Sequence, residues 1–466
     1  MARRGEARRA RDRDQGPGRD AARQGGRRPR ARDDPRPRPG VRAARALPRL
    51  RLRGREGGSR GLRREAEARL QGPLTLSRFV EPPRLRTAAG EDVDERRATW
   101  LELFFDLVFV AAVGQLANAL SSHPTFPRFL GFVAVFVPVW WAWAGFTFYA
   151  NRFDTDDLPY RLLTLLGMFL VAVLATTVRS VFDGHSSGFV VAYLGVRVIL
   201  LVLYERARRH VPEARRLTAI FLVAFGTATG FWLGSLALPA PARYWLWGVA
   251  LVLELGAPLL AWRQLPTAPI HPRHIPERFG LLTLIVLGES VLGVVLGIAH
   301  VPWGAASGAA AAAGFVAAAA LWWIYFDFLD ETTISARGLV GGLTYTYMHF
   351  FVVVGLAAMG AGVKLAIFAA GGQGRYDDTS WILCAGLAMT MVGLAAIQLV
   401  TPPVLLDADV ALRLGTVVAA LALVPFGLSP LVVALVLAGL LVAQVAYELL
   451  EHEEHAGAVS RPAPRV

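Results

Sequence analysis

Cysteine and lysine are almost missing from this chain of 466 residues, because each occurs only once, as Cys384 and Lys364. A single thiol forms no disulfide within the chain and cannot build a cysteine-based metal site. Cys384 lies in an apolar run, so we expect it to be a small buried hydrophobic residue. The use of arginine in place of lysine, with abundant Ala, Gly and Pro, is typical of translation from a GC-rich genome.

Motifs of nucleotide-dependent and hydrolytic enzymes are also missing. The sequence has no phosphate-binding loop, dinucleotide fingerprint or nucleophile elbow, so no cofactor is predicted. HPRH (271–274) and EHEEH (451–455) contain ligand-type residues, but neither has a complete coordination set. We therefore predict no metal site and no catalytic residues.

Positive charge is concentrated at the start of the chain. Residues 1–97 hold 29 arginines and 14 acidic residues, whereas the rest of the chain holds 20 basic and 22 acidic residues. Residues 1–82 cannot bury an apolar core, so we expect a disordered leader. It lacks the apolar segment of a secretory signal peptide, and a gene start placed too far upstream is the favoured interpretation of residues 1–77. Anionic lipid is an alternative partner, whereas without interleaved aromatic residues nucleic acid is not expected.

Long apolar runs fill the remainder of the chain. They raise the mean hydropathy of the whole chain to +0.42. A membrane-spanning helix needs about 20 mostly apolar residues. Strands span lipid only as closed barrels, and these runs lack period-two alternation. We predict an all-α, polytopic transmembrane helical bundle of about 12 spans, at residues 100–121, 128–149, 160–182, 187–205, 215–237, 243–262, 278–300, 307–329, 342–370, 380–400, 411–427 and 430–449.

Arginine-rich linkers follow the even-numbered spans, as in YERARRHVPEARR (204–216) and WRQLPTAPIHPRHIPER (262–278). Linkers after odd-numbered spans hold few basic residues. By the positive-inside rule, the N-terminus, the even-span linkers and the C-terminal tail (451–466) are predicted to be cytoplasmic.

Two dipeptides recur at the same spacing, which predicts an internal duplication. Glu95-Arg96 recurs as Glu277-Arg278, and Trp140-Trp141 recurs as Trp322-Trp323. The spacing divides the membrane part into parallel six-helix repeats at residues 83–264 and 265–450, as in transporters with parallel repeats.

Four segments are informative when they are taken together: PRLRTAAGEDVDERRATWLELFFDLVFVAAVGQLA (83–117), ERFGLLTLIVLGESVLGVVLGIA (277–299), LWWIYFDF (321–328) and YTYMHFFVVVGLAAMGAG (345–362). Together they resemble the bacterial low-temperature-requirement A family of membrane proteins. The LELFFDLVFV and VLGES runs are the most specific, and the resemblance extends from about Pro83 to Glu451. It implies a multi-pass protein of the bacterial cytoplasmic (inner) membrane with transporter-like hydropathy, but it implies no settled biochemical activity.

Carboxylates inside the spans are functional candidates, because a charge at membrane depth costs at least ~2.5–3.5 kcal/mol on insertion scales. Glu102 lies in the first turn of its span, where the positive end of the helix dipole favours an acid, so a structural role is expected. Asp106 lies one turn deeper on the same face. Glu289 follows Glu277 by about 18 Å of helix, which places it near the membrane midplane.

Asp327 and His349 complete the set of ionisable candidates. Asp327 lies near the cytoplasmic end of its span, and His349 is a packing residue unless a nearby carboxylate makes it a proton relay. We hypothesise that Asp106, Glu289, Asp327 and His349 form a polar cluster in the cytoplasmic half of the bundle. Other polar residues in the spans are expected to join helices (Gln115, Asn118, Glu254, Gln398) or to extend toward a membrane surface (Arg179, Arg197).

The leading functional hypothesis is movement of a small solute or ion, coupled to protons, along a path containing Asp106, Glu289, Asp327, His349 and Glu102. One alternative is an intramembrane enzyme that holds a divalent metal with the acidic stretches NRFDTDD (151–157) and DFLDE (327–331). A second alternative is a non-catalytic membrane scaffold for adaptation to cold. The bilayer and an unidentified solute are the expected partners, and the chain is not expected to be an enzyme.

Overall fold

The structure is a computed structural model that describes residues 80–86, 99–154, 156–271, 274–327, 338–400 and 408–459. Most of the predicted leader, residues 1–79, and the end of the tail, residues 460–466, lie outside the described residues. The described part contains twelve α-helices: α2 (Trp100–Ser122), α3 (Phe126–Arg152), α4 (Leu158–Phe182), α5 (Ser187–His210), α6 (Arg215–Gly234), α7 (Ala242–Leu260), α8 (His274–Ala299), α9 (Ala305–Phe326), α11 (Gly338–Ala370), α12 (Ser380–Gln398), α13 (Ala408–Ala422) and α14 (Pro430–Val459).

The all-α prediction is confirmed, and the protein is a multi-pass membrane protein. Eleven helices among the described residues are long and apolar enough to cross a membrane. The helix outside this group is α7, which matches the predicted span 243–262 in position. It carries two charged residues, Arg243 and Glu254, and an internal Pro258, which lower its hydropathy.

A short pair of strands was not predicted. β1 (Arg84–Leu85) pairs antiparallel with β2 (Phe153–Asp154), which directly follows α3. The amide of Arg86 also donates to the carbonyl of Arg152, at 3.1 Å. These bonds tie the segment before the first span to the end of α3.

Capping residues explain where two of the early helices begin. Thr99 and Glu102 form a capping box at the start of α2, in which each side chain accepts the other residue's backbone N–H. Asp157 caps α4, accepts the N–H of Tyr160 and precedes a proline in the first turn. The predicted structural role of Glu102 therefore has a specific basis.

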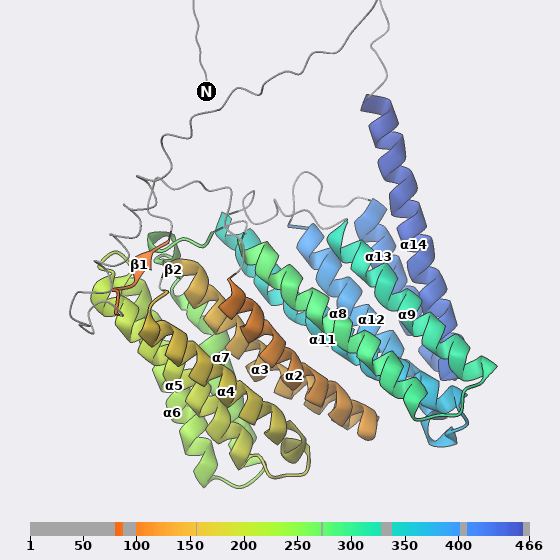
Figure 1. The fold of residues 1–466 in the computed structure, drawn as a ribbon, viewed down its shortest axis with the longest axis horizontal. Helices are drawn as coiled ribbons and strands as arrows, with labels where there is room; N and C mark the ends of the chain where they lie inside the picture. The colour runs from red at the N-terminus through yellow and green to blue at the C-terminus, as the bar shows by residue number, and fades with distance from the viewer. Residues whose placement is uncertain are drawn as a thin grey trace, which may run out of the picture. The chain divides into compact units, whose positions relative to one another are not determined.

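The helices pack in two series (Figure 1). In the first series, α2 packs on α3 and α4, and α4, α5, α6 and α7 follow as consecutive neighbours. In the second series, α8 packs on α9 and α11, and α11, α12 and α13 follow in the same way. The two series meet where α2 and α3 contact α8 and α11.

This neighbour order is what a duplication predicts, but the sixth helices differ. α7 packs mainly on α6, whereas α14 packs mainly on α9. The two-repeat organisation therefore stays a prediction.

Helix α11 packs very closely on α12 because small residues face each other. A Cβ added at Gly355 would lie 2.6 Å from the carbonyl oxygen of Gly386, and one added at Gly393 would lie 2.9 Å from that of Met348. Such contacts let helix backbones approach within a bilayer, where apolar burial alone does not drive association. They hold the helix that carries His349 firmly in place.

Candidate functional site

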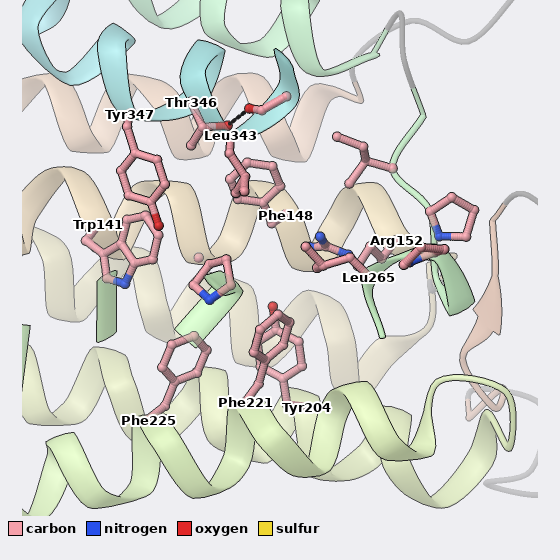
Figure 2. A pocket seen from close by; sticks show the side chains of 16 residues that line it. Trp141, Phe148, Arg152, Tyr204, Phe221, Phe225, Leu265, Leu343, Thr346 and Tyr347 are labelled. Atoms are coloured by element: carbon pink, nitrogen blue, oxygen red, sulfur yellow. Dashed lines mark hydrogen bonds between the residues drawn. The ribbon is translucent and has the colours of Figure 1, made fainter. Parts of the chain in front are cut away.

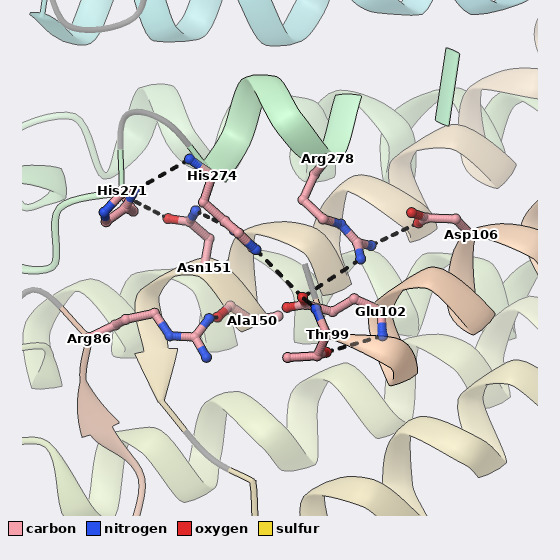
Figure 3. A network of polar contacts seen from close by, with 9 residues as sticks. All are labelled: Arg86, Thr99, Glu102, Asp106, Ala150, Asn151, His271, His274 and Arg278. Carbon is pink, nitrogen blue, oxygen red and sulfur yellow. Dashed lines mark hydrogen bonds and ion pairs between the residues drawn. The ribbon is translucent and has the colours of Figure 1, made fainter. Parts of the chain in front are cut away.

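The candidate site is a buried polar cluster between the start of α2 and the start of α8 (Figure 3). Glu102 and Asp106 lie four residues apart on α2 and therefore share one face. Asp106 is fully buried and Glu102 is 6% exposed. The capping box holds Glu102 in place, because its Oε2 accepts the N–H of Thr99 at 2.8 Å.

Two basic residues of α8 face these acids. Arg278 donates from Nη2 to Oδ1 of Asp106 at 2.8 Å, and its Nη1 lies 4.0 Å from Oε2 of Glu102. His274 lies one turn earlier, with Nε2 3.5 Å from the same glutamate oxygen. Both basic side chains are buried. One permanent cation therefore faces two carboxylates.

Helix α3 supplies the outer part of the cluster. Asn151 accepts the backbone N–H of His271 on Oδ1 at 2.7 Å, and its Nδ2 lies 3.1 Å from Nδ1 of His274. Since a backbone N–H can only donate, the amide oxygen of Asn151 points at His271 and its NH₂ points at His274. Nδ1 of His274 must then accept, which leaves its proton on Nε2, toward Glu102. Asn151 thus selects the tautomer of His274.

The bonding of Asp106 is one-sided. Its Oδ1 accepts from Arg278 and also from the indole N–H of Trp143, at 2.7 Å. Its Oδ2 is buried and has no hydrogen-bond partner among the residues that the structure describes. If both carboxylates are ionised and His274 is neutral, the buried cluster carries one uncompensated negative charge. Such a charge is costly away from water.

A surface crevice reaches the outer edge of this cluster. Its volume is about 450 Å³, and its lining includes Arg86, Thr99, Glu102, Tyr160 and Arg161. Glu102 therefore lies between the crevice and the fully buried Asp106. The first carboxylate therefore belongs to the wall of the crevice, whereas the second is enclosed.

The predicted grouping of Asp106 with Glu289 is wrong. A Cβ added at Gly114 of α2 would lie 2.7 Å from Oε1 of Glu289, so Glu289 packs against α2 eight residues beyond Asp106. Eight residues span about 12 Å of helix. Glu289 is half-buried and interacts electrostatically with Lys364 of α11, which donates to Asn118 at 3.1 Å. Glu289 thus belongs to a second polar group farther along the same pair of helices.

His349 is also outside the acidic cluster. Its Nδ1 lies 2.8 Å from the carbonyl oxygen of Tyr345, and its Nε2 lies 2.8 Å from the hydroxyl of Tyr325. A carbonyl only accepts, so Nδ1 donates and Nε2 accepts from the tyrosine. The ring of Phe279 separates His349 from Trp143, with both ring centroids 4.9 Å from that of Phe279. The packing interpretation of His349 fits these contacts better than the relay.

Asp327 does not join the predicted cluster either. It caps the C-terminus of α9, and its side chain is exposed. Of the four residues predicted to meet, only Asp106 lies in the buried cluster, and the side chains that accompany it are Glu102, Arg278, His274, Asn151 and Trp143.

Two further buried ion pairs were not predicted. Arg197 is 1% exposed and donates from Nε to Glu254 at 2.9 Å, so the prediction that it extends to a membrane surface is wrong. Tyr193 and Trp232 also donate to Glu254, which fills the acceptor positions of that carboxylate. In the second series, Arg413 of α13 lies 3.9 Å from Glu448 of α14, and both are fully buried. These pairs join helices.

Two carboxylates of the acidic stretch 151–157 form structural contacts. Asp157 is buried, caps α4 and forms an ion pair with Arg206. Asp156 binds Arg161 through two hydrogen bonds, which hold the pKa of Asp156 below its ordinary value. The side chain of Asp154 and residues 328–331 lie outside what the structure describes. Among the described residues, no three His, Cys, Asp or Glu side chains gather as metal ligands.

Comparison with known proteins identifies the relatives of this chain. A sequence model of the family described as "Bacterial low temperature requirement A protein (LtrA)" matches residues 97–447. An uncharacterized protein of Rhizobium meliloti (strain 1021) is 31% identical over 301 residues, which cover 59% of this chain and 71% of that protein. Helices α2, α3 and α8, which form the buried cluster, lie inside the matched region.

Proposed function

The chain belongs to the bacterial low temperature requirement A (LtrA) family, and we propose that it moves a small solute or ion across the bacterial cytoplasmic membrane, coupled to protons. The observation that carries the proposal is the buried cluster in which one arginine faces two carboxylates. A cluster built only to join helices would match its charges, as Arg197 and Glu254 do.

We assign the exchangeable proton to Asp106, and the contacts of the two acids support this assignment. Glu102 accepts from Thr99 and faces both His274 and Arg278, which favours its ionised form. Asp106 has a buried Oδ2 without a partner in the described part of the chain, and a proton on that oxygen neutralises the excess charge. Proton loss from Asp106 would then create a buried negative charge that a cation or a rearrangement must balance.

The seam between α2 and α8 is the proposed pathway. Glu102 and the crevice lie at its start, Asp106 follows one turn deeper, and Glu289 lies about 12 Å beyond. Gly114 lets the carboxylate of Glu289 approach the backbone of α2. By the positive-inside rule, the start of α2 and both termini face the cytoplasm.

Flux measurements in proteoliposomes test this proposal. The purified chain is reconstituted, and internal pH and cation content are followed after proton, potassium or sodium gradients are imposed. We expect Asp106→Asn and Glu289→Gln to abolish wild-type flux while both variants remain folded. The matched control is Glu213→Gln, which removes an exposed carboxylate in the loop between α5 and α6. Flux that persists in Asp106→Asn would contradict the assignment of the proton.

The enzyme hypothesis stays a weaker alternative. It needs Asp156 and Asp157 to bind a divalent metal, yet both are bonded to arginines in the structure. The scaffold hypothesis is separated by the same assay, because it predicts no flux and equal effects of all buried-acid substitutions through stability alone.

A further inference from the structure

A second feature of the fold is an apolar cavity of about 430 Å³ (Figure 2). Its lining residues come from α3, α5, α6, α7 and α11 and from the loop that contains the 3-10 helix η3 (Leu265–Thr267). Its volume is in the usual range for sites that bind small molecules. Six aromatic side chains turn toward the space: Trp141, Phe148, Tyr204, Phe221, Phe225 and Tyr347. These residues are not part of the acidic cluster.

Arg152 is the single charged residue in this lining. It is 8% exposed, and its Nε donates to the carbonyl of Ala268 at 3.2 Å. Its guanidinium carbon lies 5.4 Å from the ring centroid of Phe148 and 5.9 Å from that of Phe221. No carboxylate forms an ion pair with Arg152 in the part of the chain that the structure describes. A buried cation is normally paired, so this side chain lacks the anion that its environment calls for.

Two hydroxyl groups of the wall already have partners, whereas the buried indole N–H of Trp141 has none among the described residues. The hydroxyl of Thr346 donates to the carbonyl of Gly342 at 2.8 Å, and that of Tyr347 donates to the carbonyl of Leu255. A ligand would therefore meet one positive group, one unpaired N–H donor and an otherwise largely apolar surface. This combination selects an anionic head and rejects a molecule that is polar throughout its length.

We propose that this cavity binds an amphipathic anion, a molecule with one carboxylate or phosphate group and an apolar chain. The anionic group pairs with Arg152, and the chain packs along the aromatic wall. The guanidinium fork suits either oxyanion, because it can donate two parallel hydrogen bonds. The site is independent of the proposed ion movement, and its ligand can come from the bilayer or from solution.

Binding is measured on the purified full chain in nanodiscs of zwitterionic phosphatidylcholine, with the fluorescent fatty acid dansyl-undecanoate as the probe. Four competitors separate charge from chain: dodecanoate, dodecyl phosphate, dodecanol and inorganic phosphate. We expect displacement by the first two only. Equal displacement by dodecanol would show partition into apolar surface and overturn the proposal. Displacement by inorganic phosphate alone would overturn the requirement for a chain and identify a soluble anion as the ligand.

Two kinds of variant locate the binding. Arg152→Leu is expected to weaken probe binding at least about tenfold, the loss that corresponds to one charge-assisted contact, whereas Arg152→Lys keeps most of it. Gly342→Leu tests the same site if Arg152→Leu fails to fold. A Cβ at Gly342 meets its nearest neighbour, Ile270, at an ordinary 3.8 Å, so the longer side chain can extend into the cavity and block the probe. Arg263→Leu is the control, because Arg263 is exposed and absent from the lining. Unchanged binding in both Arg152→Leu and Gly342→Leu would overturn the proposal.

Discussion

Replacing Arg278 with Gln removes the one permanent cation that faces Glu102 and Asp106. The two acids are then left in a site where neither is more than 6% exposed. Breaking a buried ion pair by removing one partner costs about 3–5 kcal/mol of unfolding free energy. We expect Arg278→Gln to lower the unfolding free energy by about 3–5 kcal/mol. Proton uptake by one of the two acids is the change that would reduce this loss.

Asp106→Asn changes the charge in the opposite direction. Glu102 then faces Arg278 one to one, and the amide oxygen can still accept from Arg278 and Trp143, as Oδ1 does now. If Asp106 already carries a proton, the substitution also leaves the net charge unchanged. Its cost is therefore expected to be about 1 kcal/mol or less, the value of an ordinary hydrogen bond. Because the two side chains are hydrogen-bonded, the double variant should depart from the sum of the single changes by about 0.5–3 kcal/mol.

Unfolding of the purified variants in mixed micelles, titrated with sodium dodecyl sulfate and followed by tryptophan fluorescence, measures these differences. Glu213→Gln serves as the neutral control, since its side chain is exposed. An Asp106→Asn variant that is as unstable as Arg278→Gln would refute the reasoning. That result would mean that Asp106 is ionised and that Glu102 does not compensate Arg278.

Three other changes test separate parts of the structure. Gly114→Ala should reduce flux, because the added Cβ would lie 2.7 Å from Oε1 of Glu289 and displace this carboxylate. It should cost little stability, because Oε1 is the movable end of a long side chain. Proteoliposome flux and thermal melting measure the two effects. Arg197→Met should cost about 3–5 kcal/mol, because it leaves Glu254 buried without its cation, and the double change with Glu254→Gln should recover much of that loss in the same unfolding assay. Asp157→Ala should lower the unfolding free energy by at least the ~0.5–2 kcal/mol of a lost helix cap. Asp157→Asn should cost less, because Asn also caps helices. An activity that requires a metal in the wild type and is lost in these variants would instead support the enzyme hypothesis.

The spans could be predicted from sequence because hydropathy is a local property. Runs of about 20 apolar residues identify membrane helices wherever they occur, and the Ala-rich α9 and the short α13 both formed as expected. Among the described helices, only α7 departs from the pattern, since Arg243, Glu254 and Pro258 interrupt its apolar run. The structure explains the presence of Glu254 in this helix, because Glu254 forms an ion pair with Arg197 on another helix.

The partners of the buried acids could not be predicted in the same way. Asp106 and Arg278 are 172 positions apart, and hydropathy carries no information about which helices touch. Location inside the spans grouped Asp106 with Glu289 and His349, but Glu289 lies about 12 Å farther along α2. Location in a span also does not fix the direction in which a helix presents a side chain such as His349. One signal was present in the sequence: His274 and Arg278 lie four residues apart, as Glu102 and Asp106 do, which gives two helix faces of opposite charge.

The measurement that tests the central claim most directly is infrared difference spectroscopy of the reconstituted protein as pH is raised. A protonated buried carboxyl group has a carbonyl stretch that is separate from the bands of ionised carboxylates. The account predicts that one such band is lost as the cluster releases its proton, and that the band is missing from Asp106→Asn but present in Glu213→Gln. A spectrum of Asp106→Asn that keeps the full band would show that the proton resides elsewhere and would contradict the account.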